Sequence, residues 1–341
     1  MPDPNDTVPP HAQVVQMAMG YVVSRAVYLV AKLGFADKLA KGARTADDLA
    51  RECGTHAGAT YRLLRAMASL GLFTEVSPRK FGLTPMGETL KSHAPGAARE
   101  TVMMIAGTWA WPAFAEFEHA LRTGEPGAEK ALGMGMFDWM AKHPDEAALF
   151  NDGMIGIHGA EPAAVARAYD FSGLGVGGTL CDVGGGTGNL IATILRASPR
   201  LKGILYDLPH VAKAAQERLA GLGLSDRCAI AEGSFFESVP PADAYIMSHI
   251  IHDWDEEENL KILGNCKRAN PKARVLIVEM VIPPGDGPHP GKLLDLMMLN
   301  APGGMERTAE EYAQLLSKAG YRMTRVVPTE SPVSVVEGVP R

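Results

Sequence analysis

The chain has 341 residues, of which 46% are hydrophobic and 21% are charged, a composition typical of a globular protein large enough for two domains. Its formal net charge of −6 argues against nucleic acid as a main partner, because binding phosphates requires a basic surface. The four cysteines have neither zinc-site nor disulfide-framework spacing, which favours a reducing compartment such as the cytoplasm.

The first ten residues are polar and rich in proline, and they predict a disordered tail. They lack the basic and apolar regions of a signal peptide. The longest apolar run, Val102–Ala115, is too short to span a bilayer and contains Pro112. We therefore expect a cytoplasmic protein without a membrane partner.

The segment that follows has the pattern of a winged helix, with two helices, a two-stranded ribbon and a further helix. The second helix carries only Arg62 and Arg65 beside a mainly apolar face. A winged helix is often a DNA-binding module, but this face favours a protein partner and an oligomerisation surface. The predicted elements are a helix at 11–33, a helix at 45–52 capped by Thr45, a helix at 59–70, strands at 72–76 and 81–83, and a helix that begins at Thr84-Pro85.

Residues 101–165 form a helical bridge rich in methionine and aromatic residues. Packing between domains explains any single one of these side chains. Together they also fit an adaptable apolar pocket, since methionine fills irregular space and contacts aromatic rings favourably. We therefore divide the chain into an N-terminal domain at 1–100, the bridge at 101–165 and a C-terminal domain at 166–341.

From about Thr179 strands and helices alternate, which predicts a doubly wound, Rossmann-like α/β sheet. Helices are expected in the gaps after the first five strands. The last two strands lie close together and predict a C-terminal β-hairpin. Strands are predicted at 179–183, 203–207, 228–231, 243–248, 273–279, 322–327 and 333–337.

A glycine-rich loop follows the first of these strands. Asp182 ends the strand, and Gly184-Gly185-Gly186-Thr187-Gly188 leads into a helix. Glycines let a backbone turn tightly and let a ligand approach the main chain. A dinucleotide fingerprint requires a further glycine at the position of Asn189, so the loop departs from that pattern. Without a pyrophosphate to hold, the acidic residue can face a cationic amino acid moiety.

Two further strand ends complete a nucleotide-like site. Asp207, followed by Leu208, ends the second strand, where a carboxylate can accept both hydroxyls of a ribose. A turn-forming role is the alternative for Asp207. Gly233, Ser234 and Phe235 follow the third strand, where Ser234 can bond the edge of a base and Phe235 can cover its face.

The segments DVGGGTG, YDLPHV, HIIHDWDEEENLKIL, VEMVIP and GGMERTAEEY occur in the same order as in a known group. With them, the chain resembles the small-molecule O-methyltransferases related to plant caffeate and bacterial polyketide-tailoring enzymes, from about residue 15 to the C-terminus. The C-terminal hairpin is also a feature of methyltransferases. The resemblance implies S-adenosyl-L-methionine as cofactor, a small aromatic substrate and a homodimer formed through the N-terminal domain.

The resemblance also implies catalytic residues. The histidine of the HDW block, here His252, is the family's general base, and the two acids that flank it map onto Glu279 and Glu306. A phenol has a pKa near 10 and histidine one near 6.5, so full proton transfer is uphill by roughly 5 kcal/mol, and partial transfer in the transition state avoids most of that cost. A phenol or enol is therefore the preferred acceptor. Asp253 is equally compatible with a catalytic and a structural role, and His249 is better interpreted as a packing residue.

Three positions depart from the plant pattern. Plant members usually carry an acidic residue at the position of Ser234 and a lysine at that of Ser248, both near the adenosine. They also tend to have a polar residue at the position of Ala301. The last departure favours a bacterial secondary metabolite as acceptor. The acceptor pocket is expected to be lined by the bridge, by Leu293–Met298 and by the partner subunit.

Three alternatives compete with this prediction. A relative with the same fold that catalyses hydroxylation or decarboxylation would tend to lack the histidine base. A winged-helix regulator that senses S-adenosylmethionine would not need the set of His252, Glu279 and Glu306. A metal-dependent catechol methyltransferase would need a carboxylate cluster for magnesium, and the motifs supply none, so no metal site is predicted.

Overall fold

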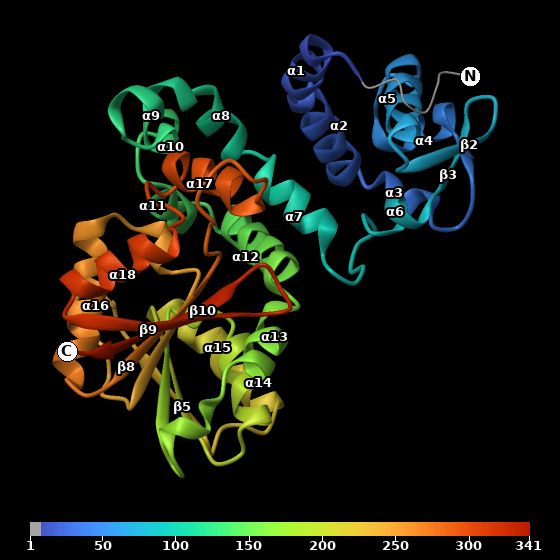
Figure 1. The fold of residues 1–341 in the computed structure, drawn as a ribbon. Coiled ribbons are helices and arrows are strands. Elements are labelled where there is room, and N and C mark those ends of the chain that lie inside the picture. Colours follow the sequence, from blue (N-terminus) through green and yellow to red (C-terminus); the bar gives the residue numbers. More distant parts are fainter. Residues whose placement is uncertain (1–7) are drawn as a thin grey trace. The chain divides into compact units, whose positions relative to one another are not determined.

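The structure, a computed structural model, describes residues 8–341, which fold into two compact units (Figure 1). The first consists of the described part of Met1–Pro112 together with Asp138–Gly159, and the second of Ala113–Phe137 together with Ala160–Arg341. The segment expected to be a bridge is shared between them. Most of the expected tail lies outside the described residues, and its last residue, Pro10, already belongs to a helix.

The helix predicted at 11–33 is present as α1 (Pro10–Ala18) and α2 (Gly20–Lys32), which are separated at Met19. Together, Pro10–Lys32 are long and apolar enough, by length and composition alone, to cross a bilayer, which is weak evidence for a membrane span. The longest apolar run was expected at 102–115, but the apolar helical stretch Pro10–Lys32 is longer. The segment 102–115 is divided between two short helices.

The rest of the N-terminal region contains the predicted helices and ribbon. The Thr45 hydroxyl accepts the N–H of Asp48 at 3.1 Å and thereby caps a helix, as its pattern predicts. The strand β1 was not predicted, because two residues are too few for an alternating pattern. The elements are α3 (Phe35–Leu39), β1 (Arg44–Thr45), α4 (Ala46–Cys53), α5 (Ala57–Ser69), β2 (Phe73–Ser77), β3 (Lys80–Leu83) and α6 (Pro85–Glu88), with strand order β1-β3-β2.

Seven helices follow before the large sheet. Within the first unit, α7 and α12 pack closely, because Gly153 leaves no side chain between them and its carbonyl accepts the hydroxyl of Thr101 at 3.0 Å. These helices are α7 (Ala98–Ile105), α8 (Ala110–Ala115), α9 (Phe117–Thr123), α10 (Gly127–Leu132), α11 (Met136–Lys142), α12 (Pro144–His158) and α13 (Glu161–Ala168).

The second unit contains a seven-stranded sheet of order β6-β5-β4-β7-β8-β10-β9. The first five strands in this order are parallel, and β10 pairs antiparallel with both β8 and β9, which confirms the C-terminal hairpin. The strands are β4 (Thr179–Val183), β5 (Lys202–Asp207), β6 (Cys228–Glu232), β7 (Ala244–Ser248), β8 (Arg274–Glu279), β9 (Tyr321–Pro328) and β10 (Ser334–Pro340).

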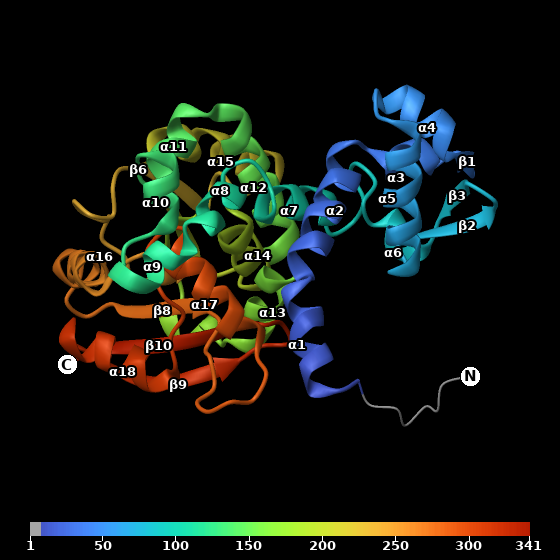
Figure 2. The same ribbon diagram turned by 90° about the horizontal axis from the view of Figure 1, so that it is seen from above.

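Helices cover both faces of this sheet (Figures 1 and 2), as expected for a doubly wound fold. One core contains residues of α13, α14 (Asn189–Ala197) and α15 (Pro209–Gly221). The other contains residues of α16 (Glu256–Ala269) and α18 (Ala309–Lys318). The remaining elements of this unit are α17 (Pro290–Asn300) and two short 3-10 turns, η1 (Phe171–Leu174) and η2 (Ile251–Asp253).

One expectation about the helices is wrong. Helices were predicted after each of the first five strands, but residues 233–243, between β6 and β7, form turns, bends and irregular backbone. This connection is short and contains Pro240 and Pro241, which donate no backbone hydrogen bonds and disrupt a helix interior.

Candidate active site

The predicted site residues of the second unit gather at the carboxyl ends of neighbouring parallel strands. Asp182 lies in β4, Asp207 ends β5, Ser248 ends β7 and Glu279 ends β8. Open α/β sheets bind ligands at this edge. The fold therefore brings together residues that are far apart in the sequence.

The glycine-rich loop connects β4 to α14 as predicted. Gly184, Gly186 and Gly188 all have positive φ angles, of 70°, 53° and 73°. A Cβ atom at Gly184 would lie only 2.4 Å from the side chain of Ile250, so this position is closed to any larger residue. At these glycines, the loop thus presents main chain rather than side chains at the edge of the sheet.

Asp182 is buried beside this loop, where a Cβ atom on Gly185 would lie 3.0 Å from its carboxyl carbon. Its Oδ2 atom has no hydrogen-bond partner among the described residues. Burial, reinforced by the nearby charge of Asp207, raises the pKa of Asp182 to about 7. A buried carboxyl with an oxygen to spare fits a cationic group of a ligand, such as the ammonium of an amino acid moiety.

Asp207 is held by the main chain on both sides. Its Oδ2 accepts the N–H of Gly186 at 2.8 Å, and its Oδ1 accepts the N–H of Leu208 at 2.7 Å. Burial raises the pKa of Asp207, although these two hydrogen bonds oppose the effect. A carboxylate oxygen can accept more than one hydrogen bond, so the predicted role at a ribose remains open to it.

The segment after β6 lies next to the glycine loop. The hydroxyl of Ser234 accepts the N–H of Phe236 at 3.3 Å, and the Phe235 ring lies 3.6 Å from where a Cβ atom of Gly184 would stand. Gly233 has a φ of 155°, and a side chain there would meet the hydroxyl of Tyr206 at 2.4 Å. The predicted base-binding segment is thus close to the glycine-rich loop.

Hydrogen bonds from side chains hold the main chain of the turn η2, which carries His252. Asn259 donates to the carbonyl of Ile251 at 2.9 Å and to that of Trp254 at 2.8 Å. The buried guanidinium of Arg307 also donates to the carbonyl of Ile251, at 3.1 Å. With the carbonyls on both sides of His252 held, the turn presents the imidazole in one direction.

The imidazole of His252 is buried, with an exposed fraction of 4% for the residue. Its Nδ1 lies 2.6 Å from Oε1 of Glu306, and its Nε2 lies 3.6 Å from Oδ1 of Asp253. Glu279 contacts the main chain instead, since its Oε1 accepts the backbone N–H of His252 at 3.1 Å.

These acids make His252 strongly basic. Burial lowers the pKa of the imidazole, but Asp253, the hydrogen bond to Glu306 and the charge of Glu279 outweigh this effect and raise the pKa to about 10. Burial has the opposite effect on an acid and raises the pKa of Asp253 to about 6. The cluster therefore stabilises an imidazolium and suits the uptake of a proton from a weakly acidic group.

Several residues of this region were not singled out from the sequence. Asp295 of α17 accepts the backbone N–H of Glu306 at 2.8 Å, and the hydroxyl of Tyr312 in α18 donates to Glu279. His249 pairs with buried Glu161 at 2.8 Å, in agreement with a packing role, and its ring centroid lies 5.1 Å from that of His252. Only the acidic character of Asp295 and Glu161 was visible in the sequence, without a signal for their contacts.

Glu306 also lies outside the helix that follows it. Thr308 and Glu311 form a reciprocal capping box at the start of α18, and Asp255 and Glu258 do the same for α16, as their patterns predict. Glu306 is therefore not required as a helix-start carboxylate.

Comparison with known proteins identifies the group to which these features belong. A family model described as the O-methyltransferase domain matches residues 114–322, and one described as the O-methyltransferase dimerisation domain matches residues 15–93. A phenazine O-methyltransferase of Lysobacter antibioticus is 42% identical, over 98% of this chain and 97% of its own length.

Two solved structures extend the comparison. That of a mitomycin 7-O-methyltransferase has a TM-score of 0.90 and 35% identity, covering 97% of this chain and 98% of its own. An O-methyltransferase from neocarzinostatin biosynthesis, in complex with S-adenosylmethionine and 2-hydroxy-5-methyl naphthoic acid, has a TM-score of 0.83 and 33% identity, covering 94% of this chain and 96% of its own.

Proposed function

Because the chain belongs to the family of S-adenosylmethionine-dependent O-methyltransferases, we propose that it methylates a phenolic or enolic hydroxyl of a small aromatic or polyketide-like metabolite, with His252 as general base. The observation that carries this proposal is the 2.6 Å contact between Nδ1 of His252 and Glu306. It leaves Nε2 to receive the proton of the acceptor, because Asp253 is beyond hydrogen-bond distance from it.

The basicity of His252 matches a phenol as acceptor. Proton transfer from a phenol of pKa near 10 to an ordinary histidine costs roughly 5 kcal/mol, but to a base of pKa about 10 it costs close to nothing. An aliphatic alcohol is a far weaker acid and would gain much less. Glu306 stabilises the imidazolium that forms and keeps its ring oriented.

The described residues around the glycine loop fit the cofactor, which supplies an electrophilic methyl group on a cationic sulfur. The spare oxygen of buried Asp182 suits the ammonium of its amino acid moiety, and Asp207 suits the ribose. We assign the cofactor to Asp182, Gly184, Gly185, Gly186, Gly188, Asp207, Leu208, Gly233, Ser234, Phe235 and Ser248.

The relatives support an aromatic acceptor. The names of the similar proteins refer to a phenazine, a mitomycin and a naphthoic acid, all of which contain fused rings. Incubation with methyl-labelled cofactor and a panel of phenols, naphthols, flavonoids and anthraquinones tests the proposal. Labelled methyl ethers are expected from at least one phenolic class, and transfer only to amines or thiols would contradict it.

The competing functions make different predictions. A hydroxylase or decarboxylase would consume the acceptor without transferring the label. A regulator would bind DNA in a mobility-shift assay at physiological salt. A magnesium-dependent enzyme would lose activity in EDTA, whereas we expect methyl transfer to continue. The buried pair of His252 and Glu306 favours methyl transfer with histidine as the base over all three.

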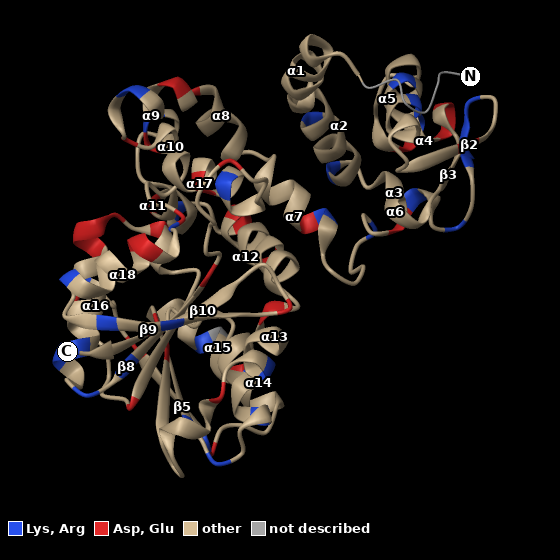
Figure 3. Ribbon diagram, in the orientation of Figure 1, with Lys and Arg blue, Asp and Glu red and all other residues tan. Residues whose placement is uncertain are grey.

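We also propose that the enzyme is a homodimer assembled through its N-terminal region. The helix α1 carries no charged residue (Figure 3), and α1 and α2 expose Val14, Met17 and Tyr21 by more than half. Apolar faces of this kind mark an interaction site. The match to the dimerisation-domain family begins at residue 15 and so includes the end of α1 and all of α2.

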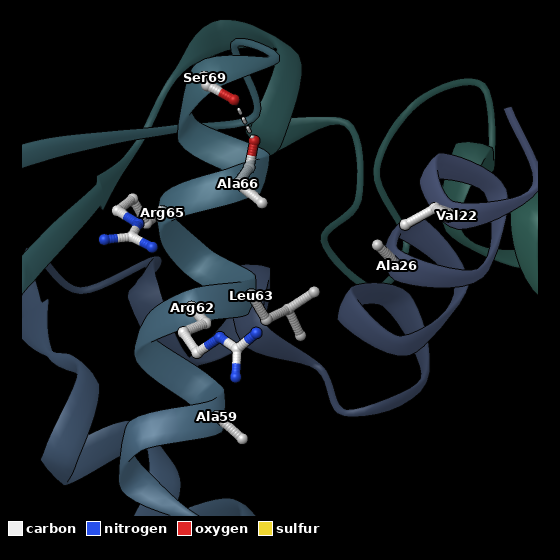
Figure 4. Close-up of a pocket in the computed structure, with 8 residues that line it drawn as sticks. All are labelled: Val22, Ala26, Ala59, Arg62, Leu63, Arg65, Ala66 and Ser69. Atoms are coloured by element: carbon white, nitrogen blue, oxygen red, sulfur yellow. Dashed lines mark hydrogen bonds between the residues drawn. The ribbon is translucent and has the colours of Figure 1, made fainter. Parts of the chain in front are cut away.

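A groove between α2 and α5 adds to this surface. It has a volume of about 640 Å³ (Figure 4), with Val22 and Ala26 on one side and Leu63 and Ala66 on the other. We infer that a second copy of the chain covers this mostly apolar groove. Its Arg62 and Arg65 are too few for a nucleic-acid surface.

Light scattering tests the dimer. Replacing Met17 and Tyr21 by Glu is expected to produce monomers, whereas Leu121→Glu, at an exposed apolar position of α9, leaves the dimer intact. Binding of the unmodified protein to anionic phospholipid vesicles would instead indicate that α1 and α2 attach to a membrane.

We propose a cytoplasmic location. All four cysteines are free in the structure, and Cys181, Cys228 and Cys266 are buried, as suits a reducing compartment. Cell fractionation tests this proposal, and recovery of the enzyme in the membrane fraction would contradict it.

A further inference from the structure

Glu279 is a carboxylate without exposed surface at the end of β8. Its Oε1 accepts the backbone N–H of His252 at 3.1 Å, and its Oε2 accepts the phenolic hydrogen of Tyr312. A buried carboxylate is costly unless hydrogen-bond donors surround it. Among the described residues, the hydroxyl of Tyr312 is thus one of two donors that hold Glu279 in place.

Tyr312 is well placed to act as a fixed donor. It lies in the first turns of α18, which is anchored by the capping box of Thr308 and Glu311, and it has no exposed surface. Burial, together with the charge of Glu279, raises the pKa of Tyr312 well above its ordinary value. The side chain therefore keeps its proton and donates rather than exchanging it with a substrate.

We propose that Tyr312 is a positioning residue for methyl transfer, which acts through Glu279 to fix the main chain at His252 and so the direction of the imidazole. This inference rests on the proposed role of His252 as the base. The base is then held in two independent ways, by Glu306 at the ring and by the Tyr312–Glu279 pair at the backbone.

Removing the hydroxyl of Tyr312 changes the position of the Glu279 carboxyl or its charge. Without Tyr312 as donor, Oε2 of Glu279 is buried without a partner, and the carboxyl must rotate or take up a proton. Rotation frees the backbone N–H of His252, and a displacement of about 1 Å at a reacting group can cost about 10²-fold in rate. Protonation removes a negative charge that raises the pKa of His252.

The charged and titratable groups near Glu279 define the expected pH effect. They are His252, Asp253 and Glu306 on one side and Tyr312 and Arg307 on the other. If Glu279 becomes neutral, His252 loses one negative neighbour and its pKa falls. The acid limb of the profile of kcat/KM against pH therefore moves to lower pH, which a loss of packing alone would not cause.

The test compares Tyr312→Phe with Tyr321→Phe. Tyr321 is another fully buried tyrosine of the same core, and its hydroxyl has no hydrogen-bond partner among the described residues. We expect Tyr312→Phe to lower the plateau value of kcat at high pH by about tenfold to a hundredfold, with the KM for the cofactor changed less than twofold and the acid limb at lower pH. The control should retain the kcat and the pH profile of the unmodified enzyme.

A measurement without substrate separates this inference from the proposed function. The pKa of His252, followed by NMR in histidine-labelled protein, is expected to fall in Tyr312→Phe and not in Tyr321→Phe. If the unmodified enzyme methylates no phenol, the proposed function fails, and the NMR titration still tests the link from Tyr312 to His252. An unchanged His252 pKa, or unchanged kcat with full phenol methylation, overturns the inference.

A second variant covers a failure of Tyr312→Phe to fold. Glu279→Gln removes the charge that needs the donor, so the double variant with Tyr312→Phe leaves no buried carboxylate unpaired at this position. We expect the double variant to match Glu279→Gln in kcat. A further tenfold loss in the double variant would show that Tyr312 does not act through Glu279.

Discussion

At the end of β4, Asp182 is buried and one of its oxygens has no donor among the described residues, whereas at the end of β8 both oxygens of Glu279 accept hydrogen bonds from the chain itself. The two carboxylates lie at the same edge of one sheet. The first has an oxygen left for a hydrogen bond from a ligand, and the second already accepts hydrogen bonds from the protein at both oxygens. The comparison supports the proposed division of the site into a cofactor half, with a carboxyl group available to a ligand, and a catalytic half held by hydrogen bonds within the chain.

The largest expected effect separates the two halves directly. His252→Ala removes the base, and we expect methyl transfer to fall by about 10²–10⁴-fold, the usual contribution of general base catalysis. Binding of the cofactor should stay nearly unchanged, because among the described residues this side chain makes no hydrogen bond to the glycine loop. Turnover with labelled cofactor and calorimetric titration measure the two quantities. Retained turnover would remove His252 from the mechanism.

The pH dependence sharpens the description of the catalytic half. Acidic neighbours raise the pKa of His252 to about 10, so the neutral base is a minor form at pH 7. Below the pKa, the neutral fraction grows about tenfold per pH unit. The rate kcat/KM is therefore expected to rise about a hundredfold between pH 7 and 9, and a profile that is flat above pH 7 would contradict the assigned basicity.

Asp182→Asn tests the cofactor half. Loss of the carboxylate charge is expected to weaken cofactor binding about tenfold, equivalent to about 1.4 kcal/mol, since a charge-assisted hydrogen bond is replaced by a neutral one. The value of kcat at saturating cofactor should change little. Calorimetry and saturation kinetics separate the two effects. An effect on kcat without an effect on binding would assign Asp182 to the other half of the site.

The smallest expected effect concerns Asp253, which lies 3.6 Å from Nε2 of His252 and raises its pKa. In Asp253→Asn that charge is lost, so the pKa of His252 falls and the acid limb of the kcat/KM profile moves to lower pH. The plateau rate at high pH should change by only about twofold to threefold if Asp253 is electrostatic and makes no contact with the reacting atoms. A loss comparable to that in His252→Ala would make Asp253 catalytic.

Local patterns predicted much of the fold. The caps at Thr45, Thr308 and Asp255 are present because a side chain and a backbone N–H a few residues away decide them. The strands of the sheet and its terminal hairpin were predicted from apolar runs and turn residues. The helix expected after β6 is absent, since the regular alternation of strands and helices was extended over Pro240 and Pro241.

The candidate site was predicted unevenly. Asp182, the glycine loop and Asp207 lie where the sequence indicated, because each is defined by its position at a strand end. The contact of Glu279 was not predicted, since the family resemblance identifies an acid without saying whether it meets the ring or the backbone of His252. Tyr312 carried no signal, because a buried tyrosine in an amphipathic helix is ordinary core.

The sequence by itself determined the order of most strands and helices and the turn of the glycine loop, because backbone preferences and short motifs act over a few residues, and the family resemblance indicated His252 as the candidate base. Only the tertiary structure decided which acid holds the ring of His252, which holds its backbone, and what holds those acids in turn. These hydrogen bonds join residues separated by one or more complete elements, and they form only when α17 and α18 return to the edge of the sheet.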